Sequence, residues 1–217
     1  MIYRITLILS LLLLPFMGTA CSSDIASNAT PDAAVADTVK INTPQLPAMP
    51  DKPTGTAFIV VSKRDMKLSV YDRNQAGDTV MVAQFPCCMG KNKGDKQRRG
   101  DMRTPESPAG KPFRITIIQD ASTWKHDFHD GRGNILAYGN WFLRLATPGH
   151  KGIGIHGSTG NEHTVPGRAS EGCIRLLDKD IITLKEHFAY VGMPVTILAE
   201  GQAPLPWETR ARQRSTR

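Results

Sequence analysis

The residues most capable of chemistry in this sequence are a histidine and a cysteine that lie 17 positions apart. His156 ends a predicted strand over residues 152–156, and Cys173 follows a loop that contains several glycines. A cysteine attacks as a thiolate, and an imidazole within reach is the usual group that removes its proton. Gly172, directly before the cysteine, allows a sharp turn and a close approach of a substrate carbonyl to main-chain N–H groups. The pair indicates thiol-dependent acyl transfer, although a buried structural cysteine would give the same spacing.

The segment around this pair resembles the signature of a known family. His156 and Gly157 come first, a loop that contains Pro166 follows, and Ser-Glu-Gly-Cys-Ile-Arg closes the segment at residues 170–175. This order resembles L,D-transpeptidases of the YkuD type, and the resemblance extends over residues 56–199. Three further segments match the family in order, at residues 58–72, 100–105 and 192–197. The resemblance implies a YkuD-like, mainly β domain that acts on the stem peptides of bacterial peptidoglycan, with no cofactor and no metal.

Position by position, the resemblance implies a role for most residues of the signature. Cys173 is the nucleophile, His156 is its base, and the backbone carbonyl of Gly157 orients the imidazole. Main-chain N–H groups near Gly172 and Cys173 hold the oxyanion. Ser170 braces the cysteine loop.

Two charged residues of the signature leave alternatives open. Arg175 either holds a substrate carboxylate or pins the cysteine loop. Glu171 stands where the family usually has histidine, and its carboxylate favours thiol over thiolate if it points at Cys173. The implied reaction transfers a stem tetrapeptide to an amine. Hydrolysis of the same bond and non-catalytic binding to the wall are the alternatives.

Other residues with chemical potential form weaker patterns. A zinc hydrolase would need the histidines, but His-Asp-Phe-His-Asp lies in a polar, glycine-containing stretch and not on a helix. These histidines are His126, His129, His150 and His163. Adjacent cysteines rarely bridge each other, so Cys87 and Cys88 indicate two small buried side chains or a wall of the substrate groove. The run from Lys91 to Arg99 is typical of a solvated loop.

The elements that must position these residues are mostly strands. Short apolar or alternating runs predict strands at residues 57–62, 67–72, 79–85, 113–119, 141–146, 152–156 and 195–198. Residues 91–112 are rich in glycine, proline and charge and predict a loop, and residues 120–138 are polar without a period. The pattern favours a mainly β domain, a sandwich or small barrel.

One helix is expected to cover the sheet near the C-terminus of the domain. It is predicted over residues 178–191, with Asp178 as its cap. An apolar stripe on it consists of Ile181, Leu184 and Phe188. Gly192 and then Pro194 are expected to end it.

The ends of the chain predict export. Residues 1–20 resemble a signal peptide of the lipoprotein type, because a long apolar run and three small residues precede Cys21, the expected site of lipidation. Gly18 stands where such signals usually have leucine, and a plain cleaved signal peptide with an incidental cysteine is the alternative. Residues 21–53 are poor in large apolar side chains and predict a disordered tether. Residues 54–200 then form the catalytic domain and residues 201–217 a basic tail.

The charge of the chain points to an anionic partner. The net charge is +7, and removal of Arg4 with the signal peptide lowers it by one. A basic surface suits an acidic wall polymer or lipid headgroups, and ordinary solubility is the alternative explanation of the charge. Nucleic acid is not expected, because the basic residues are scattered. We therefore expect a periplasmic monomer, anchored to a membrane of the bacterial envelope through its lipid.

Overall fold

Three consecutive runs of aliphatic and β-branched residues form an antiparallel meander at the start of the domain. In the computed structural model, which describes residues 46–202, they are β1 (Phe58–Ser62), β2 (Lys67–Arg73) and β3 (Thr79–Pro86). The turn between β2 and β3 lies at Gly77, whose φ of 79° suits glycine. All three strands lie within two residues of their predicted bounds.

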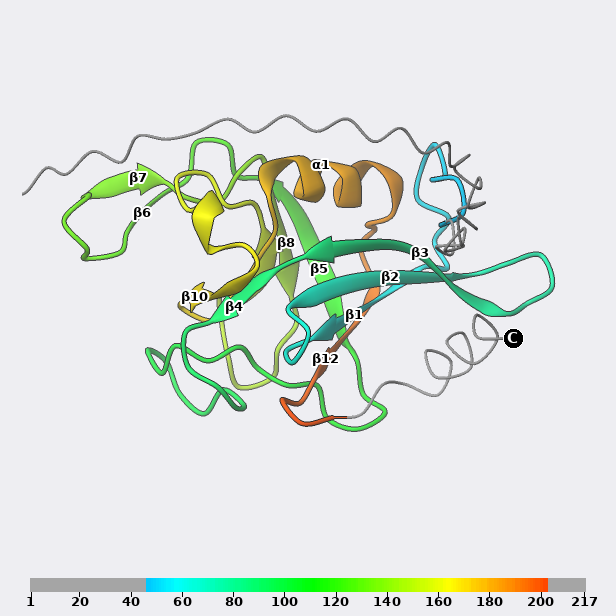
Figure 1. Cartoon of the computed structure of the whole chain (residues 1–217), viewed down its shortest axis with the longest axis horizontal. Coiled ribbons are helices and arrows are strands. Elements are labelled where there is room, and N and C mark those ends of the chain that lie inside the picture. Colours follow the sequence, from blue (N-terminus) through cyan, green and yellow to red (C-terminus); the bar gives the residue numbers. More distant parts are fainter. Residues whose placement is uncertain (1–45, 203–217) are drawn as a thin grey trace, which may run out of the picture. The chain divides into compact units, whose positions relative to one another are not determined.

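The remaining strands extend this meander into one ten-stranded sheet with the order β10-β4-β11-β9-β8-β5-β12-β1-β2-β3 (Figure 1). They are β4 (Cys88–Gly90), β5 (Phe113–Asp120), β8 (Trp141–Leu145), β9 (Gly154–His156), β10 (Gly167–Ser170), β11 (Ile174–Arg175) and β12 (Pro194–Leu198). Strand β5 joins the two halves, since it pairs with β12 on one side and with β8 on the other. The mainly β architecture predicted from the sequence is confirmed.

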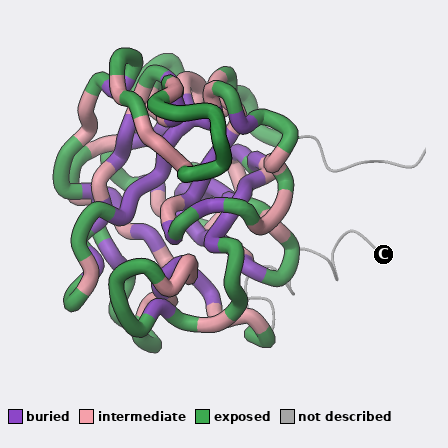
Figure 2. The backbone as a smooth tube through the Cα atoms, turned by 90° about the vertical axis from the view of Figure 1, so that its left-hand side faces the viewer, coloured by how far each residue is buried: buried purple, intermediate pink, exposed green. Residues whose placement is uncertain are grey.

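One apolar core is shared by both halves of the sheet and by the helix α1 (Asp178–His187). The stripe Ile181, Leu184 and Phe188 is buried, and α1 packs against β8 and β9. Figure 2 shows buried segments running through the interior, with exposed turns around them.

The bounds of α1 differ from the prediction at both ends. Asp178 is the first helical residue and not the cap, which is Leu177 without a side-chain hydrogen bond. The Asp178 carboxylate instead accepts hydrogen bonds from the Ser158 N–H at 2.7 Å and the Thr159 hydroxyl at 2.5 Å. The helix ends at His187 and does not reach residue 191, because Phe188 leaves helical angles (φ −131°).

The polar stretch at residues 120–138 contains a hairpin that the sequence did not predict. Strands β6 (Lys125–Asp127) and β7 (Asn134–Leu136) pair only with each other, and the hairpin projects at the β4–β10 end of the fold (Figure 1). The loop after β9 contains a 3-10 turn, η1 (Glu162–Thr164). Elements of three residues are too short to carry a detectable hydrophobic period.

The terminal predictions fall largely outside the described residues. The signal peptide, Cys21, residues 21–45 of the tether and residues 203–217 of the tail all lie there. Residues 46–53 have no regular structure, and the carbonyl of Pro50 lies 2.7 Å from Nδ1 of His187. Within residues 46–202, no helix has the length and apolar character needed to cross a membrane.

Candidate active site

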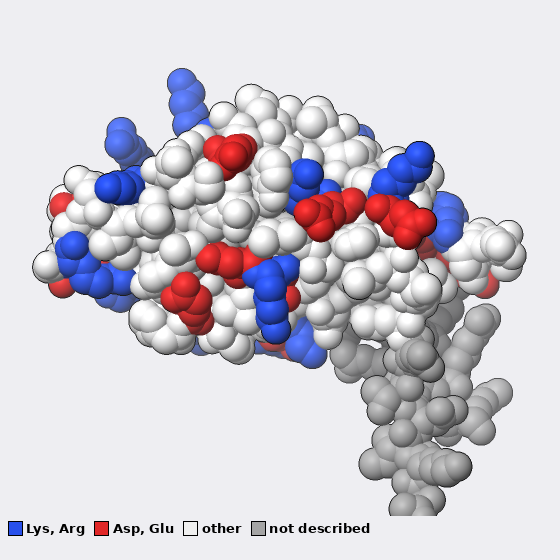
Figure 3. All heavy atoms as spheres, turned by 90° about the horizontal axis from the view of Figure 1, so that it is seen from above, with Lys and Arg blue, Asp and Glu red and all other residues white. Residues whose placement is uncertain are grey.

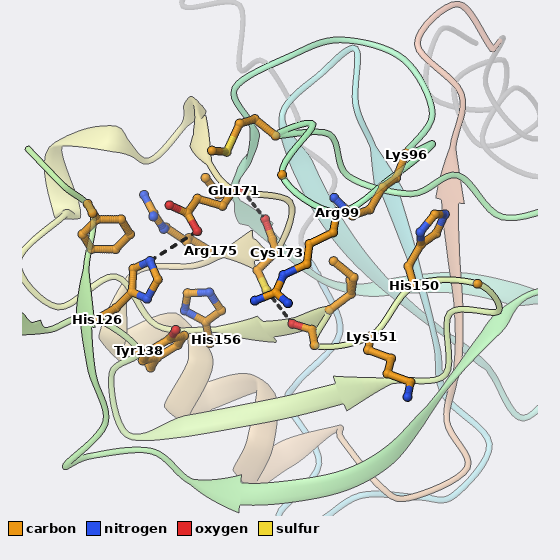
Figure 4. Close-up of a pocket in the computed structure, with 17 residues that line it drawn as sticks. Lys96, Arg99, His126, Tyr138, His150, Lys151, His156, Glu171, Cys173 and Arg175 are labelled. Atoms are coloured by element: carbon orange, nitrogen blue, oxygen red, sulfur yellow. Dashed lines mark hydrogen bonds and ion pairs between the residues drawn. The ribbon is translucent and has the colours of Figure 1, made fainter.

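The parallel pairing of β9 with β11 brings the histidine and the cysteine loop together. Arg175 is the register partner of His156, and the Leu176 N–H donates to the His156 carbonyl at 2.8 Å. Cys173 directly precedes β11, so it lies near the start of β9. Its Sγ donates to the Gly152 carbonyl at 3.4 Å (Figure 4). Both side chains line the same cavity.

His156 is held in a buried aromatic setting. Its ring stacks on Phe142 at 5.6 Å and lies 4.8 Å from the ring of Tyr138. Nδ1 lies 2.7 Å from the carbonyl of Gly157. A carbonyl only accepts, so the proton is on Nδ1 and Nε2 carries the free lone pair. Burial, and then the charge of Arg175, lower the pKa of His156 to about 3, which keeps the imidazole neutral.

The residue after this histidine must be glycine for steric reasons. A Cβ at Gly157 would come within 2.3 Å of Oδ1 of Asp178. That carboxylate is the one that accepts from the Ser158 N–H, so the helix start and the end of β9 are packed directly together. The close approach fixes the carbonyl that orients His156.

The cysteine loop is braced by a buried serine. Oγ of Ser170 donates to the Cys173 carbonyl at 2.6 Å and accepts from the Gly172 N–H at 3.1 Å. Gly172 has φ 134°, and a Cβ there would lie 2.7 Å from the Arg103 carbonyl, so a side chain does not fit. The Gly172 N–H was expected to help hold an oxyanion, but it is engaged inside the loop. The Cys173 N–H has no hydrogen-bond partner among the described residues.

Opposing influences act on the thiol. Burial raises the pKa of Cys173, while the Gly154 N–H and the cations Arg175, Lys96 and Arg144 lower it. The net shift is upward, so the resting group is a thiol and not a preformed thiolate. The two shifts both favour the neutral forms, a thiol on Cys173 and a neutral imidazole on His156.

Glu171 points away from the thiol toward the β6–β7 hairpin. Its Oε2 lies 3.2 Å from Nε2 of His126, and Figure 4 shows the pair on the side of Cys173 opposite Lys96 and Arg99. The sequence could not assign this contact, because His126 is 45 positions away on a strand that was not predicted.

Arg175 is a buried cation without an acidic partner in the described part of the chain. Only 3% of it is exposed, and its guanidinium lies over the Phe128 ring at 5.0 Å. Its Nε is buried without a hydrogen-bond partner. No hydrogen bond of this side chain pins the cysteine loop, which weakens one of the two roles suggested by the sequence.

The cavity at Cys173 has a volume of about 710 Å³ and receives side chains from loops far apart in sequence. Lys96, Arg99 and Lys151 lie on one side and His126 and Tyr138 on the other (Figure 4). The sequence did not predict these contributions. Lys96 belongs to the run read as a solvated loop, but it is buried and forms an ion pair with Asp101 at 2.8 Å.

The sequence also matches a known family. A model of the L,D-transpeptidase catalytic domain, YkuD, matches residues 56–197. The chain belongs to the YkuD family. A search of curated proteins gave no match.

Solved structures similar to this YkuD domain come from several bacteria. Bd1075 of Bdellovibrio bacteriovorus is 21% identical, with 79% of this chain and 59% of that chain covered and a TM-score of 0.49. The helical cell shape determining protein Pgp2 of Campylobacter jejuni is 20% identical, with 72% and 52% covered and a TM-score of 0.47. An L,D-transpeptidase of Mycobacterium smegmatis is 18% identical, with 66% and 58% covered and a TM-score of 0.43. The present chain spans between half and three-fifths of each.

Of the other cysteines and histidines among residues 46–202, only His126 and His150 line the cavity. Cys87 and Cys88 are fully buried and do not line it. Across residues 46–202, no three metal-binding side chains are grouped closely enough to hold an ion.

Proposed function

We propose that this YkuD domain is a cysteine-dependent L,D-transpeptidase that acts on peptidoglycan stem tetrapeptides. One observation carries the proposal: the pairing of β9 with β11 brings His156 and Cys173 to one cavity, within a chain of this family. The imidazole presents an unprotonated Nε2, because Nδ1 donates to Gly157. That is the state a general base requires.

Acylation begins with attack of Sγ of Cys173 on the carbonyl carbon of the third, diamino-acid residue. The thiol proton moves to Nε2 of His156 as the S–C bond forms, which suits a site that starts from a neutral pair. The C–N bond to the terminal D-alanine then breaks, and His156 returns the proton to the departing amine. A thioester remains on Cys173.

Two groups of the cavity are expected to stabilise negative charge, one on the oxyanion and one on a substrate carboxylate. The Cys173 N–H is the main-chain donor for the oxyanion, since the Gly172 N–H is bonded to Ser170. Arg175 binds a substrate carboxylate, because a buried guanidinium without an acidic partner gains most from a charged ligand.

Deacylation repeats the steps with a second amine. The incoming amine loses a proton to His156, attacks the thioester carbon and expels the thiolate, which regains the proton. Water in place of the amine gives a carboxypeptidase. The product therefore identifies the acceptor.

The proposal is tested by incubating the protein with purified muropeptides and analysing the products by mass spectrometry. Cys173→Ala should lower turnover at least a thousandfold, because the covalent nucleophile is lost. Cys87→Ala, which removes a thiol outside the cavity, should remain active. A cross-linked product means transpeptidation, a shortened stem means hydrolysis, and turnover by Cys173→Ala refutes the nucleophile.

We also propose that the domain works in the periplasm as a lipid-anchored protein. The support is the sequence alone, in which the apolar run before Cys21 resembles a lipoprotein signal. On the face seen in Figure 3, acidic and basic side chains are interspersed, which suits a soluble surface. The parent protein should partition into detergent with the membranes, whereas Cys21→Ser should be recovered as soluble protein in the periplasmic fraction. Membrane association that survives this substitution would mean a different anchor.

A further inference from the structure

An acidic residue lies two positions before the proposed nucleophile. Glu171 lines the same cavity as Cys173 and belongs to the same short loop. A carboxylate near a thiol disfavours the thiolate and raises its pKa. Three cations, Arg175, Lys96 and Arg144, act on the Cys173 thiol in the opposite sense, and a carboxylate turned toward the sulfur would offset them.

The carboxylate is held elsewhere by a residue with no role in the proposed reaction. Nε2 of His126 lies 3.2 Å from Oε2 of Glu171. That nitrogen is buried and has no hydrogen bond of good geometry in the described part of the chain, so its ion pair with the Glu171 carboxylate is the polar contact observed for it. Glu171 itself is 44% exposed, which leaves it room to rotate once released.

The His126 ring is positioned by its own hairpin. It meets the Phe128 ring edge-on at 4.5 Å and lies 6.3 Å from the ring of Tyr138. Its backbone is fixed by pairing with Ile135 across the β6–β7 sheet. Ring contacts and strand pairing therefore position the imidazole, whereas the Glu171 side chain is the more exposed member of the pair.

We propose that His126 is a positioning residue that holds the Glu171 carboxylate away from Cys173 and so keeps the thiol reactive. The proposal rests on the proposed function, because it assumes that Cys173 is the nucleophile. It explains how Cys173 can stay reactive although Glu171 lies two positions before it in the same loop. Without His126, the Glu171 carboxylate turns toward Cys173 and the thiol pKa rises.

The test is the rate at which iodoacetamide alkylates Cys173 as a function of pH, followed by peptide mass spectrometry. His126→Ala should slow alkylation at neutral pH roughly tenfold, the effect of one unit in the thiol pKa. The double variant His126→Ala/Glu171→Gln should recover the parent rate, because the carboxylate charge is gone. Glu171→Gln alone should react at least as fast as the parent.

The matched control is His129→Ala on the same hairpin. The His129 side chain is 87% exposed and does not line the cavity, and its Nδ1 lies 3.7 Å from Oδ1 of Asp127, so its loss should leave alkylation unchanged. If the double variant stays as slow as His126→Ala, the histidine acts through packing of the hairpin, and the proposal is wrong. An unchanged rate in His126→Ala also overturns it.

Alkylation requires no muropeptide, so the two proposals fail separately. If the alkylation rates follow the expected pattern but no muropeptide is turned over, His126 still screens Glu171 and the proposed function fails. In an active preparation, His126→Ala should lower kcat more than it changes KM. The double variant His126→Ala/Glu171→Gln should then have the kcat of the parent. A loss of kcat without this recovery contradicts the positioning role.

Discussion

The two halves of the sheet are held together by different forces. In the half formed by β1, β2, β3 and β12, strands have five to eight residues and bury mostly aliphatic side chains. In the half formed by β4, β9, β10 and β11, strands have two to four residues and bury polar side chains beside apolar ones such as Met89, Ile155 and Ile174. The buried polar residues there are His156, Ser170 and Arg175.

This contrast separates stability from chemistry. Burial of apolar area stabilises the first half without demanding any particular hydrogen bond. The second half buries groups that must be satisfied one by one, because an unpaired buried polar group is costly. The first half can therefore serve as a scaffold, and the second fixes the positions of the groups to which we assign the reaction. Each prediction below tests that division.

The largest effect is expected from Leu68→Ala in β2. Leu68 is fully buried in the main core, so its truncation should lower the free energy of unfolding by about 3 kcal/mol, measured by urea denaturation. The pH dependence of Cys173 alkylation in the folded variant should not change. Lys67→Ala, which truncates the exposed side chain directly before Leu68, is the control and should change neither measurement. A shifted alkylation profile in Leu68→Ala would show that the halves are coupled.

A smaller loss of stability with a specific loss of activity is expected from Ser170→Ala. The change leaves the Gly172 N–H and the Cys173 carbonyl without their shared hydroxyl, which should cost about 2 kcal/mol. Turnover of muropeptides should fall about a hundredfold, because the nucleophile is displaced. Thr183→Ala removes an exposed hydroxyl from α1 and should affect neither measurement. Equal losses of turnover in both variants would contradict the division.

The third prediction concerns stability against pH. The folded pKa of His156 lies at about 3, whereas an unfolded histidine titrates near 6.5, so below that pH the unfolded chain binds the extra proton. The free energy of unfolding should therefore decrease as the pH is lowered, by about 1.4 kcal/mol for each pH unit between about pH 6 and 4.5. His156→Gln should lack that part of the slope. Parallel curves for the two proteins would mean that His156 is not buried as a neutral group.

The same division explains what could be predicted from the sequence. The strands of the scaffold half carry apolar runs long enough to reveal their period, so β1, β2, β3 and β12 were predicted closely. The apolar stripe of α1 was predicted for the same reason. Strands β4, β6, β7, β10 and β11 were missed, because two to four residues contain no period and their pairing depends on partners distant in sequence.

Prediction of the site was limited by the same physics. His156 and Cys173 could be singled out, since their residue types carry the chemistry and a family resemblance surrounds them. Lys96, His126 and Tyr138 could not, because each enters the cavity from a separate loop or hairpin. The engagement of the Gly172 N–H by Ser170 depends on φ at Gly172, which residue types do not specify.

The smallest effect is expected from Asp130→Asn, at the tip of the β6–β7 hairpin. Asp130 forms an ion pair with Arg132 at 2.6 Å, and hydrogen bonds from that guanidinium lower its pKa, but both side chains are well exposed. Solvent screens such a pair, so the urea midpoint should not change measurably. Cys173 alkylation should also match the parent, although His126→Ala on the same hairpin slows it. This pair of variants separates one contact from the hairpin as a whole. Asp130 does not line the cavity, whereas His126 lines it and has a buried nitrogen 3.2 Å from the Glu171 carboxylate. Slower alkylation in Asp130→Asn would mean that the shape of the hairpin, and not the contact between His126 and Glu171, controls the reactivity of the thiol.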